Sequence, residues 1–128
     1  MKRNQRKSIL VIEDEPEICE FASKVLELEG YEVLHAEDGN EGLKLVRERE
    51  YAMILLDLKL PEPDGWVVLE EIMADQELHR IPVVVFTATA EISQRNRAIS
   101  MGVADYLVKP VSATRLKEIV AHVLRQER

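Results

Sequence analysis

The sequence predicts a doubly wound α/β domain, in which five parallel strands in the order 2-1-3-4-5 are flanked by five helices. Short apolar runs alternate with amphipathic stretches five times, and no internal linker or low-complexity segment interrupts them. This alternation implies right-handed crossovers, which place helices on both faces of a parallel sheet. The length of 128 residues suits one domain.

The first half of the chain supplies two strands and two helices. The β-branched run Ser8–Ile12 predicts the first strand. A helix is expected from Pro16, a residue suited to a first helical turn, to a cap at Gly30. The second strand is expected over Tyr31–Ala36 and the second helix over Gly39–Glu50.

The third strand is the most apolar part of the chain. Tyr51–Leu56 contains six consecutive apolar residues, as expected for a strand buried on both faces of a parallel sheet. Gly65 opens the third helix, and Ile81–Phe86 is the fourth strand, with Pro82 tolerable only near its start.

The remaining elements are a polar helix over Glu91–Met101, a strand over Asp105–Val108 and a final amphipathic helix. The final helix is marked by apolar residues at positions i, i+3, i+4, i+7 and i+8, namely Leu116, Ile119, Val120, Val123 and Leu124.

Composition excludes several classes of function. The net charge of −7 and the small number of aromatic residues argue against a nucleic-acid binder. No apolar run approaches the roughly 18 residues of a membrane span, and no signal peptide is evident. The single cysteine, Cys19, fits a reducing compartment. We therefore expect a cytoplasmic protein with a basic flexible tail at residues 1–7 and one domain at residues 8–128.

Polar side chains follow four of the five predicted strands. Glu13 and Asp14 follow the first strand, Asp57 the third, Thr87 the fourth and Lys109 the fifth. The carboxyl ends of parallel strands meet at one edge of the sheet, where ligands bind in open α/β folds. A surface group of salt bridges around Lys109 is the simpler alternative.

The negative charge of three carboxylates at one edge of the sheet must be balanced. Two bare carboxylates about 5 Å apart repel by roughly 3 kcal/mol at an effective dielectric constant near 20, so a cation or protons must be present. A small set of oxygen ligands favours Mg²⁺. Zinc is disfavoured because no His or Cys stands at a strand end with ligand spacing.

A carboxylate beside a metal, a hydroxyl and a lysine can accept a phosphoryl group as an aspartyl-phosphate. The metal and the lysine would offset the charge of the phosphoryl oxygens in the transition state. The segment GNEG around Gly39 lacks the lysine and the placement of a phosphate-binding loop. The phosphoryl group is therefore expected from a small donor or another protein, with no bound nucleotide cofactor.

The segments VIEDEP, LLDLKLPEPDGW, VVVFTA and DYLVKP occur in this order and spacing. With them, the chain resembles a response-regulator receiver domain of two-component signalling, of the flavodoxin-like fold and the single-domain type, from about Ser8 to its end. The resemblance implies that Asp57 accepts a phosphoryl group from the phosphohistidine of a sensor kinase or phosphotransfer protein. It also implies a signalling phosphoacceptor that catalyses only its own phosphoryl transfer and slow autodephosphorylation.

The resemblance further implies a ligand set for Mg²⁺. Asp14 and Asp57 would ligate the ion directly, together with the backbone carbonyl of Lys59. Glu13 stands where the family more often has Asp, and it is expected to hold the metal through water.

Other roles implied by the resemblance concern the phosphorylated state. Thr87 would hydrogen-bond a phosphoryl oxygen and Lys109 would pair with it, with the Lys109–Pro110 bond expected to be cis. Lys59 and Thr89 occupy positions at which family members tune the lifetime of that state.

Tyr106 fits the family's aromatic switch, outward without phosphate and inward once Thr87 moves toward it. The alternative is an aromatic side chain that simply packs on an edge strand. The resemblance places partner binding or dimerisation on the fourth helix, fifth strand and fifth helix, with Ile92 and Ile99 in the docking patch.

Two other functions stay open at this point. Hydrolases that form an aspartyl-phosphate also use an Asp after an apolar strand, but they usually have a second Asp where this chain has Lys59. A constitutive docking domain that is never phosphorylated is the third possibility, and the complete acid cluster argues against it.

Overall fold

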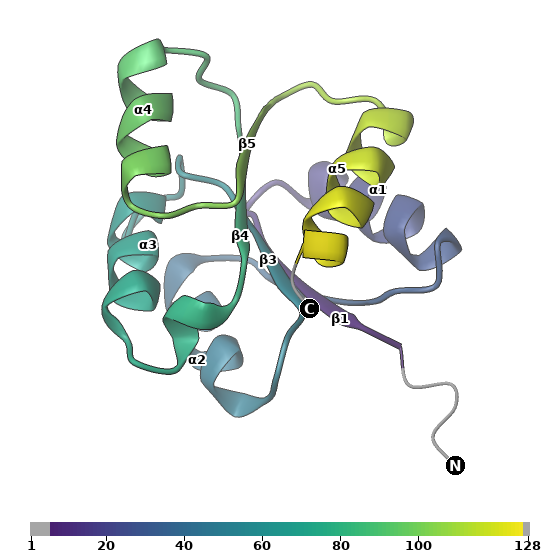
Figure 1. Ribbon diagram of the computed structural model, residues 1–128, viewed down its shortest axis with the longest axis horizontal. Helices are drawn as coiled ribbons and strands as arrows, with labels where there is room; N and C mark the ends of the chain where they lie inside the picture. The colour runs from purple at the N-terminus through teal and green to yellow at the C-terminus, as the bar shows by residue number, and fades with distance from the viewer. Residues whose placement is uncertain (1–5, 127–128) are drawn as a thin grey trace.

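The computed structural model of the chain describes residues 6–126 (Figure 1). Residues 1–5 of the predicted basic tail lie outside the described residues, as do residues 127 and 128. The carbonyl of Lys7 already accepts a hydrogen bond from the backbone N–H of Glu32 at 2.9 Å. No helix of the described part is long and apolar enough to cross a membrane.

Five parallel strands form one sheet in the order β2-β1-β3-β4-β5, as the sequence predicts. The strands are β1 (Ser8–Ile12), β2 (Glu32–Ala36), β3 (Met53–Leu56), β4 (Val83–Thr87) and β5 (Asp105–Val108). The helices are α1 (Pro16–Leu28), α2 (Gly39–Glu48), α3 (Gly65–Ala74), α4 (Ile92–Ser100) and α5 (Ala113–Gln126), with a short 3₁₀ helix η1 (Leu78–Arg80).

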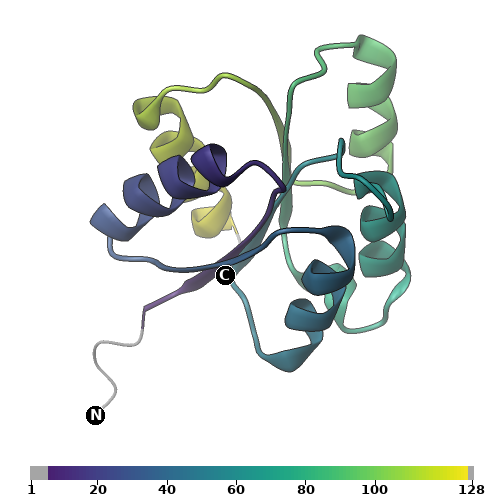
Figure 2. The same ribbon diagram turned by 180° about the vertical axis from the view of Figure 1, so that it is seen from behind.

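The helices form two layers around the sheet. Figures 1 and 2 show α1 and α5 on one face and α2, α3 and α4 on the other. Alternate strand residues supply the two cores. In β1, Leu10 and Ile12 pack in the core beneath α2, α3 and α4, whereas Ile9 and Val11 pack in the core beneath α1 and α5. Burial on both faces explains why the central strands are uniformly apolar.

The observed bounds differ from the predicted ones for local reasons. Strand β3 begins at Met53, two residues after Tyr51, because its pairing with β1 starts opposite Ile9. Strand β4 begins at Val83, after the proline that cannot donate to the sheet, and it extends to Thr87. The helix η1 was not predicted from the sequence.

Candidate functional site

The carboxyl edge of the sheet brings together the predicted site residues. The side chains of Glu13, Asp14 and Asp57 each offer a carboxylate oxygen, and these oxygens lie within 4.8 Å of one another. Glu13 and Asp57 are buried, at 1% and 4% exposure, whereas Asp14 is exposed. This burial does not fit the alternative of a surface group of salt bridges. A set of three oxygen donors open on the Asp14 side fits a hard divalent cation that keeps some of its water.

Lys109 connects two of the carboxylates. Its Nζ donates to Glu13 Oε1 at 2.6 Å and to Asp57 Oδ2 at 3.1 Å. Glu15 Oε1 lies 3.8 Å from the same ammonium, and the ring centroid of Phe86 lies 5.4 Å away. The sequence alone indicates no role for Glu15, although this residue belongs to the VIEDEP segment.

The protonation of the pair formed by Glu13 and Lys109 reflects its burial. Burial raises the pKa of Glu13 to about 7, against the hydrogen bond from Lys109, and the charge of Asp57 adds to the increase. Burial alone would lower the pKa of Lys109, but the hydrogen bond to Glu13 and the charge of Asp57 raise it above its usual value. The lysine therefore stays charged, and its ammonium donates to both carboxylates.

Thr87 is fully buried, and its Oγ1 has no hydrogen-bond partner among the described residues. Its carbonyl accepts a hydrogen bond from the backbone N–H of Lys109 at 2.8 Å, which ties the end of β4 to the end of β5. Buried hydroxyls nearly always have a partner. An unpaired hydroxyl next to this group of charges is a donor available to a ligand.

Backbone contacts fix the position of Asp57. Its N–H donates to the carbonyl of Ile12 at 3.1 Å, and its Oδ1 accepts from the N–H of Lys59 at 2.9 Å. Gly65 closes the loop, because its N–H donates to the carbonyl of Leu58 at 3.0 Å. A Cβ atom at Gly65 would lie 2.2 Å from the Asp57 carbonyl oxygen, so this position accepts only glycine without a shift of the loop. From the sequence alone, Gly65 is predicted only to start a helix.

Tyr106 occupies the inward of its two predicted positions. The side chain is 6% exposed, and its hydroxyl donates to the carbonyl of Thr89 at 3.1 Å. The bond between Lys109 and Pro110 is cis, as predicted. On the nearby surface, Ile92 and Ile99 of α4 are 72% and 42% exposed.

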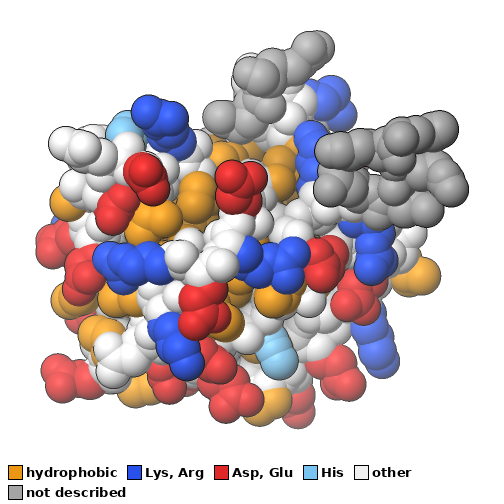
Figure 3. Space-filling model, turned by 90° about the horizontal axis from the view of Figure 1, so that it is seen from below, with side chains coloured by type: hydrophobic (Ala, Val, Ile, Leu, Met, Phe, Trp, Pro, Cys, Tyr) orange, Lys and Arg blue, Asp and Glu red, His pale blue; other side chains and the backbone are white. Residues whose placement is uncertain are grey.

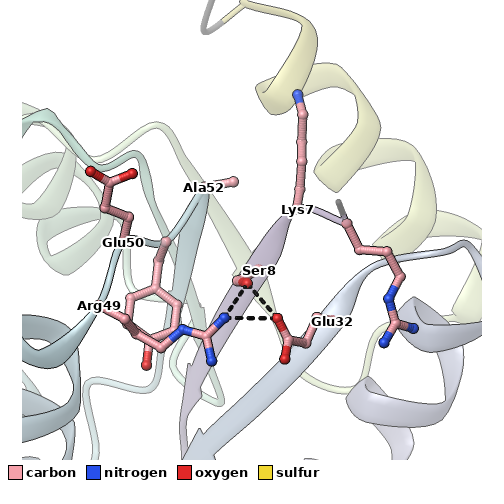
Figure 4. A pocket seen from close by; sticks show the side chains of 8 residues that line it. Lys7, Ser8, Glu32, Arg49, Glu50 and Ala52 are labelled. Atoms are coloured by element: carbon pink, nitrogen blue, oxygen red, sulfur yellow. Dashed lines mark hydrogen bonds and ion pairs between the residues drawn. The ribbon is translucent and has the colours of Figure 1, made fainter. Parts of the chain in front are cut away.

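The amino edge of the sheet carries two cavities of about 640 and 900 Å³, far along the strands from the carboxylates. Figure 3 shows this face, where basic and acidic side chains are interspersed with apolar ones. Arg49, Glu32 and Ser8 form a hydrogen-bonded triangle in the smaller cavity (Figure 4). None of the predicted site residues lines either cavity.

Comparison with known proteins identifies related chains. Residues 9–121 match the family model of the response regulator receiver domain. The chain is 37% identical over 118 residues to the transcriptional regulatory protein HprR of Escherichia coli, covering 92% of this chain and 52% of that protein. It is 36% identical over 118 residues to the DNA-binding dual master transcriptional regulator RpaA of Synechocystis, covering 92% of this chain and 49% of RpaA. The chain thus spans about half the length of these relatives.

Among solved structures, the chain is similar to a CheY-like response regulator receiver domain protein from Methanospirillum hungatei. The TM-score is 0.89 at 28% sequence identity, with 96% of this chain and 97% of that chain covered. The similarity therefore extends over the whole sheet and its helices.

Proposed function

The chain belongs to the response regulator receiver domain family, and we propose that Asp57 is its phosphoacceptor. In this proposal, residues 8–128 form a receiver domain that takes a phosphoryl group from the phosphohistidine of a sensor kinase or phosphotransfer protein. The proposal is supported by the environment of Asp57, whose buried carboxylate contacts the Lys109 ammonium beside the unpaired hydroxyl of Thr87.

The transfer is a displacement at phosphorus. A carboxylate oxygen of Asp57 forms a bond to phosphorus as the bond from phosphorus to the imidazole nitrogen breaks, and the electron pair stays on that nitrogen. Lys109 pairs with a phosphoryl oxygen through its ammonium, and the Thr87 hydroxyl donates to another. Slow hydrolysis of the acyl phosphate returns the carboxylate, with Lys59 and Thr89 flanking the site.

The residues at this edge fit Mg²⁺. Asp14, Asp57 and the backbone carbonyl of Lys59 would hold the ion directly, and Glu13 would hold it through water; the bound ion would neutralise charge on the phosphoryl oxygens. The exposure of Asp14 supports this assignment, because it leaves room on one side for water and for the phosphoryl donor.

The response of the domain is proposed to pass through Thr87 to Tyr106. Phosphorylation adds about −1.5 to −2 charges beside Thr87 and Lys109. The Tyr106 hydroxyl is bonded to the backbone of Thr89, two residues after Thr87, so a shift of this loop changes the setting of the aromatic ring. The surface of α4, β5 and α5, which includes exposed Ile92, would then bind a downstream protein or a second copy.

Labelling with a small donor tests the phosphoacceptor. The wild type, Asp57→Asn and Asp64→Asn are incubated with acetyl phosphate and Mg²⁺, and their intact masses are measured. Asp64 is the matched control because it lies in the same loop, where it caps α3 by accepting from Val67 N–H at 3.1 Å. Asn caps a helix as well as Asp does.

We expect one added phosphoryl group in the wild type and in Asp64→Asn, and none in Asp57→Asn or without Mg²⁺. Absence of an adduct in a folded wild type would contradict the proposal and favour a constitutive docking domain. Continuous release of phosphate from many phosphorylated substrates would favour a hydrolase instead.

A further inference from the structure

Helices α3 and α4 lie side by side (Figures 1 and 2), and a side-chain clamp of Arg97, Trp66 and Glu70 joins them. The guanidinium of Arg97 lies over the Trp66 ring, 4.0 Å from its centroid, and Arg97 Nη2 lies 3.7 Å from Glu70 Oε2. Trp66 and Glu70 are one helical turn apart, so both can meet the same side chain of α4. A planar cation stacked on an indole ring is attracted to its face. The clamp therefore holds α4 against α3 at the surface.

The α3 side of the clamp is held close to Asp57. Trp66 follows Gly65, whose N–H donates to the carbonyl of Leu58 at 3.0 Å. A Cβ atom at Gly65 would lie 2.2 Å from the Asp57 carbonyl oxygen and 2.3 Å from Leu58 Cα, so the first turn of α3 packs directly on this backbone. Trp66 also packs against the core beneath α2, α3 and α4. These contacts give Arg97 a fixed surface on which to stack.

Helix α4 has few other attachments. Ala98 is its one buried residue, and its N-cap residue, Glu91, makes no capping hydrogen bond through its side chain among the described residues. Before the helix begins at Ile92, the Tyr106 hydroxyl donates to the carbonyl of Thr89 at 3.1 Å. Ala98 and Tyr106 pack in the same core. The helix is therefore attached at its start through Tyr106, at its middle through this core and near its end through the clamp.

We infer that the clamp holds α4 in the position that accepts the inward ring of Tyr106, so that this ring is inward before any phosphoryl group arrives. The clamp and the inward ring occur together in this structure. A contact shifts a two-state equilibrium only by the difference in its free energy between the states. For an exposed cation–π pair, that difference changes the ratio of the two populations about two- to fivefold.

The inference rests on the proposed function, because it concerns the helix through which phosphorylation of Asp57 would act. If the inward state is the one that favours a phosphoryl group, the apparent dissociation constant of a phosphoryl mimic varies inversely with the inward fraction. The loss of a surface contact on α4 should then weaken binding at Asp57 in proportion, although Arg97 does not belong to the acidic cluster.

The test compares Arg97→Ala with Asn96→Ala in the full chain. Asn96 is the matched control, because it is an exposed neighbour on the same helix. Arg97→Lys keeps the charge and loses the planar group. The first readout is the ¹⁹F signal of Tyr106 in protein labelled with 3-fluorotyrosine, assigned by its absence in Tyr106→Phe. Relaxation dispersion of this signal gives the populations of the inward and outward rings. The second readout is the affinity for beryllofluoride, a phosphoryl mimic, in the presence of Mg²⁺.

We expect the ring of Tyr106 to be mainly inward in the wild type and in Asn96→Ala without beryllofluoride. In Arg97→Ala the ratio of inward to outward populations should fall about two- to fivefold, with Arg97→Lys between the two. An unchanged ratio in Arg97→Ala, an equal fall in Asn96→Ala or a mainly outward ring in the wild type would overturn the inference. So would an affinity for beryllofluoride that does not follow the inward fraction.

The ¹⁹F readout requires neither Mg²⁺ nor phosphorylation. If the wild type is not phosphorylated and does not bind beryllofluoride, while the ratio falls in Arg97→Ala alone, the proposed function fails and the role of the clamp stands. If Asp57 is phosphorylated and the ratio is the same in the wild type and Arg97→Ala, the role of the clamp fails alone.

Discussion

At the scale of single residues, the buried hydroxyl of Thr87 costs folding free energy that packing does not require. Its side chain is fully buried, yet its hydroxyl has no partner among the described residues. An unsatisfied buried polar group costs about 1–3 kcal/mol of folding free energy. A valine would fill the same space without that cost, so packing alone does not account for a threonine here.

The first prediction concerns Thr87→Val. Because the substitution removes an unpaired hydroxyl and keeps the shape, it should raise the free energy of unfolding by about 1 kcal/mol. The yield of phosphorylated protein with acetyl phosphate should fall, since a donor to the phosphoryl group is lost. Urea denaturation and intact mass measure the two effects. Thr114→Val, at an exposed position of α5, should change neither, and a destabilised Thr87→Val would contradict the argument.

At the scale of elements, α4 is the α-helix with the fewest buried residues. Of its described residues only Ala98 is buried. A side-chain clamp joins it to α3, because the guanidinium of Arg97 lies 4.0 Å from the ring centroid of Trp66. Arg97 also lies 3.7 Å from Glu70 of α3. Since the core gives α4 little support, this clamp helps to set where the helix lies.

The second prediction follows from the clamp. Arg97→Ala should lower the free energy of unfolding by about 0.5–1 kcal/mol, the value of a cation–π pair at an exposed site. It should also move the fluorescence of Trp66, the one tryptophan of the chain, to longer wavelength as water reaches the ring. Arg95→Ala, on the same helix and also exposed, serves as the control. Equal effects of the two substitutions would show that the clamp does not hold α4.

The amino edge of the sheet joins β1, β2 and the segment after α2 through one charged triangle. Glu32 Oε1 accepts from Ser8 Oγ at 2.8 Å and from Arg49 at 2.8 Å (Figure 4). The hydrogen bond from Ser8, followed by that from Arg49, lowers the pKa of Glu32 below its ordinary value of 4.5. Folding therefore favours the ionised carboxylate.

The third prediction is the pH dependence that this shift causes. A lowered pKa in the folded state contributes stability above the ordinary value of 4.5, and this contribution is lost as the pH falls through the folded pKa. The wild type should exceed Glu32→Gln in unfolding free energy near neutral pH, and the difference should shrink below pH 4.5. Denaturation at several pH values measures the difference. Glu27→Gln, which removes the same charge at an exposed position of α1, serves as the matched control.

At the scale of the whole molecule, the site joins loops from both layers of the fold. Glu13 and Asp14 precede α1 on one face, whereas Asp57 precedes α3 on the other. A ligand that binds between them connects loops that lead into the two opposite helix layers. Binding to the folded chain alone raises its stability by mass action.

The fourth prediction is that Mg²⁺ stabilises the entire domain. At a concentration of about 100 times its dissociation constant, the ion should raise the free energy of unfolding by about 2.7 kcal/mol. Thermal unfolding of the wild type and Asp14→Asn with and without Mg²⁺ measures the effect, which the substitution should reduce strongly. Glu118→Gln, an exposed change of the same charge on α5, should keep it. The same stabilisation in Asp14→Asn would place the ion elsewhere.

The elements, their order and the composition of the site follow from the amino-acid sequence alone. Alternation of apolar runs and helical patterns is a local property, so five strands and five helices could be predicted within a few residues. The placement of Asp57, Thr87 and Lys109 at one edge also followed, because parallel strands must end on the same side. The 3₁₀ helix η1 was missed because its three residues carry no periodic signal.

The hydrogen bonds among the site residues depend on the three-dimensional packing of the strands. The hydrogen bonds of Lys109 to both Glu13 and Asp57 depend on distances between different strands. The same is true of the unpaired hydroxyl of Thr87 and of the inward ring of Tyr106. A sequence pattern fixes which residues reach the edge of the sheet. It does not fix separations of a few tenths of an ångström, and these determine the hydrogen bonds and charges on which the proposed chemistry depends.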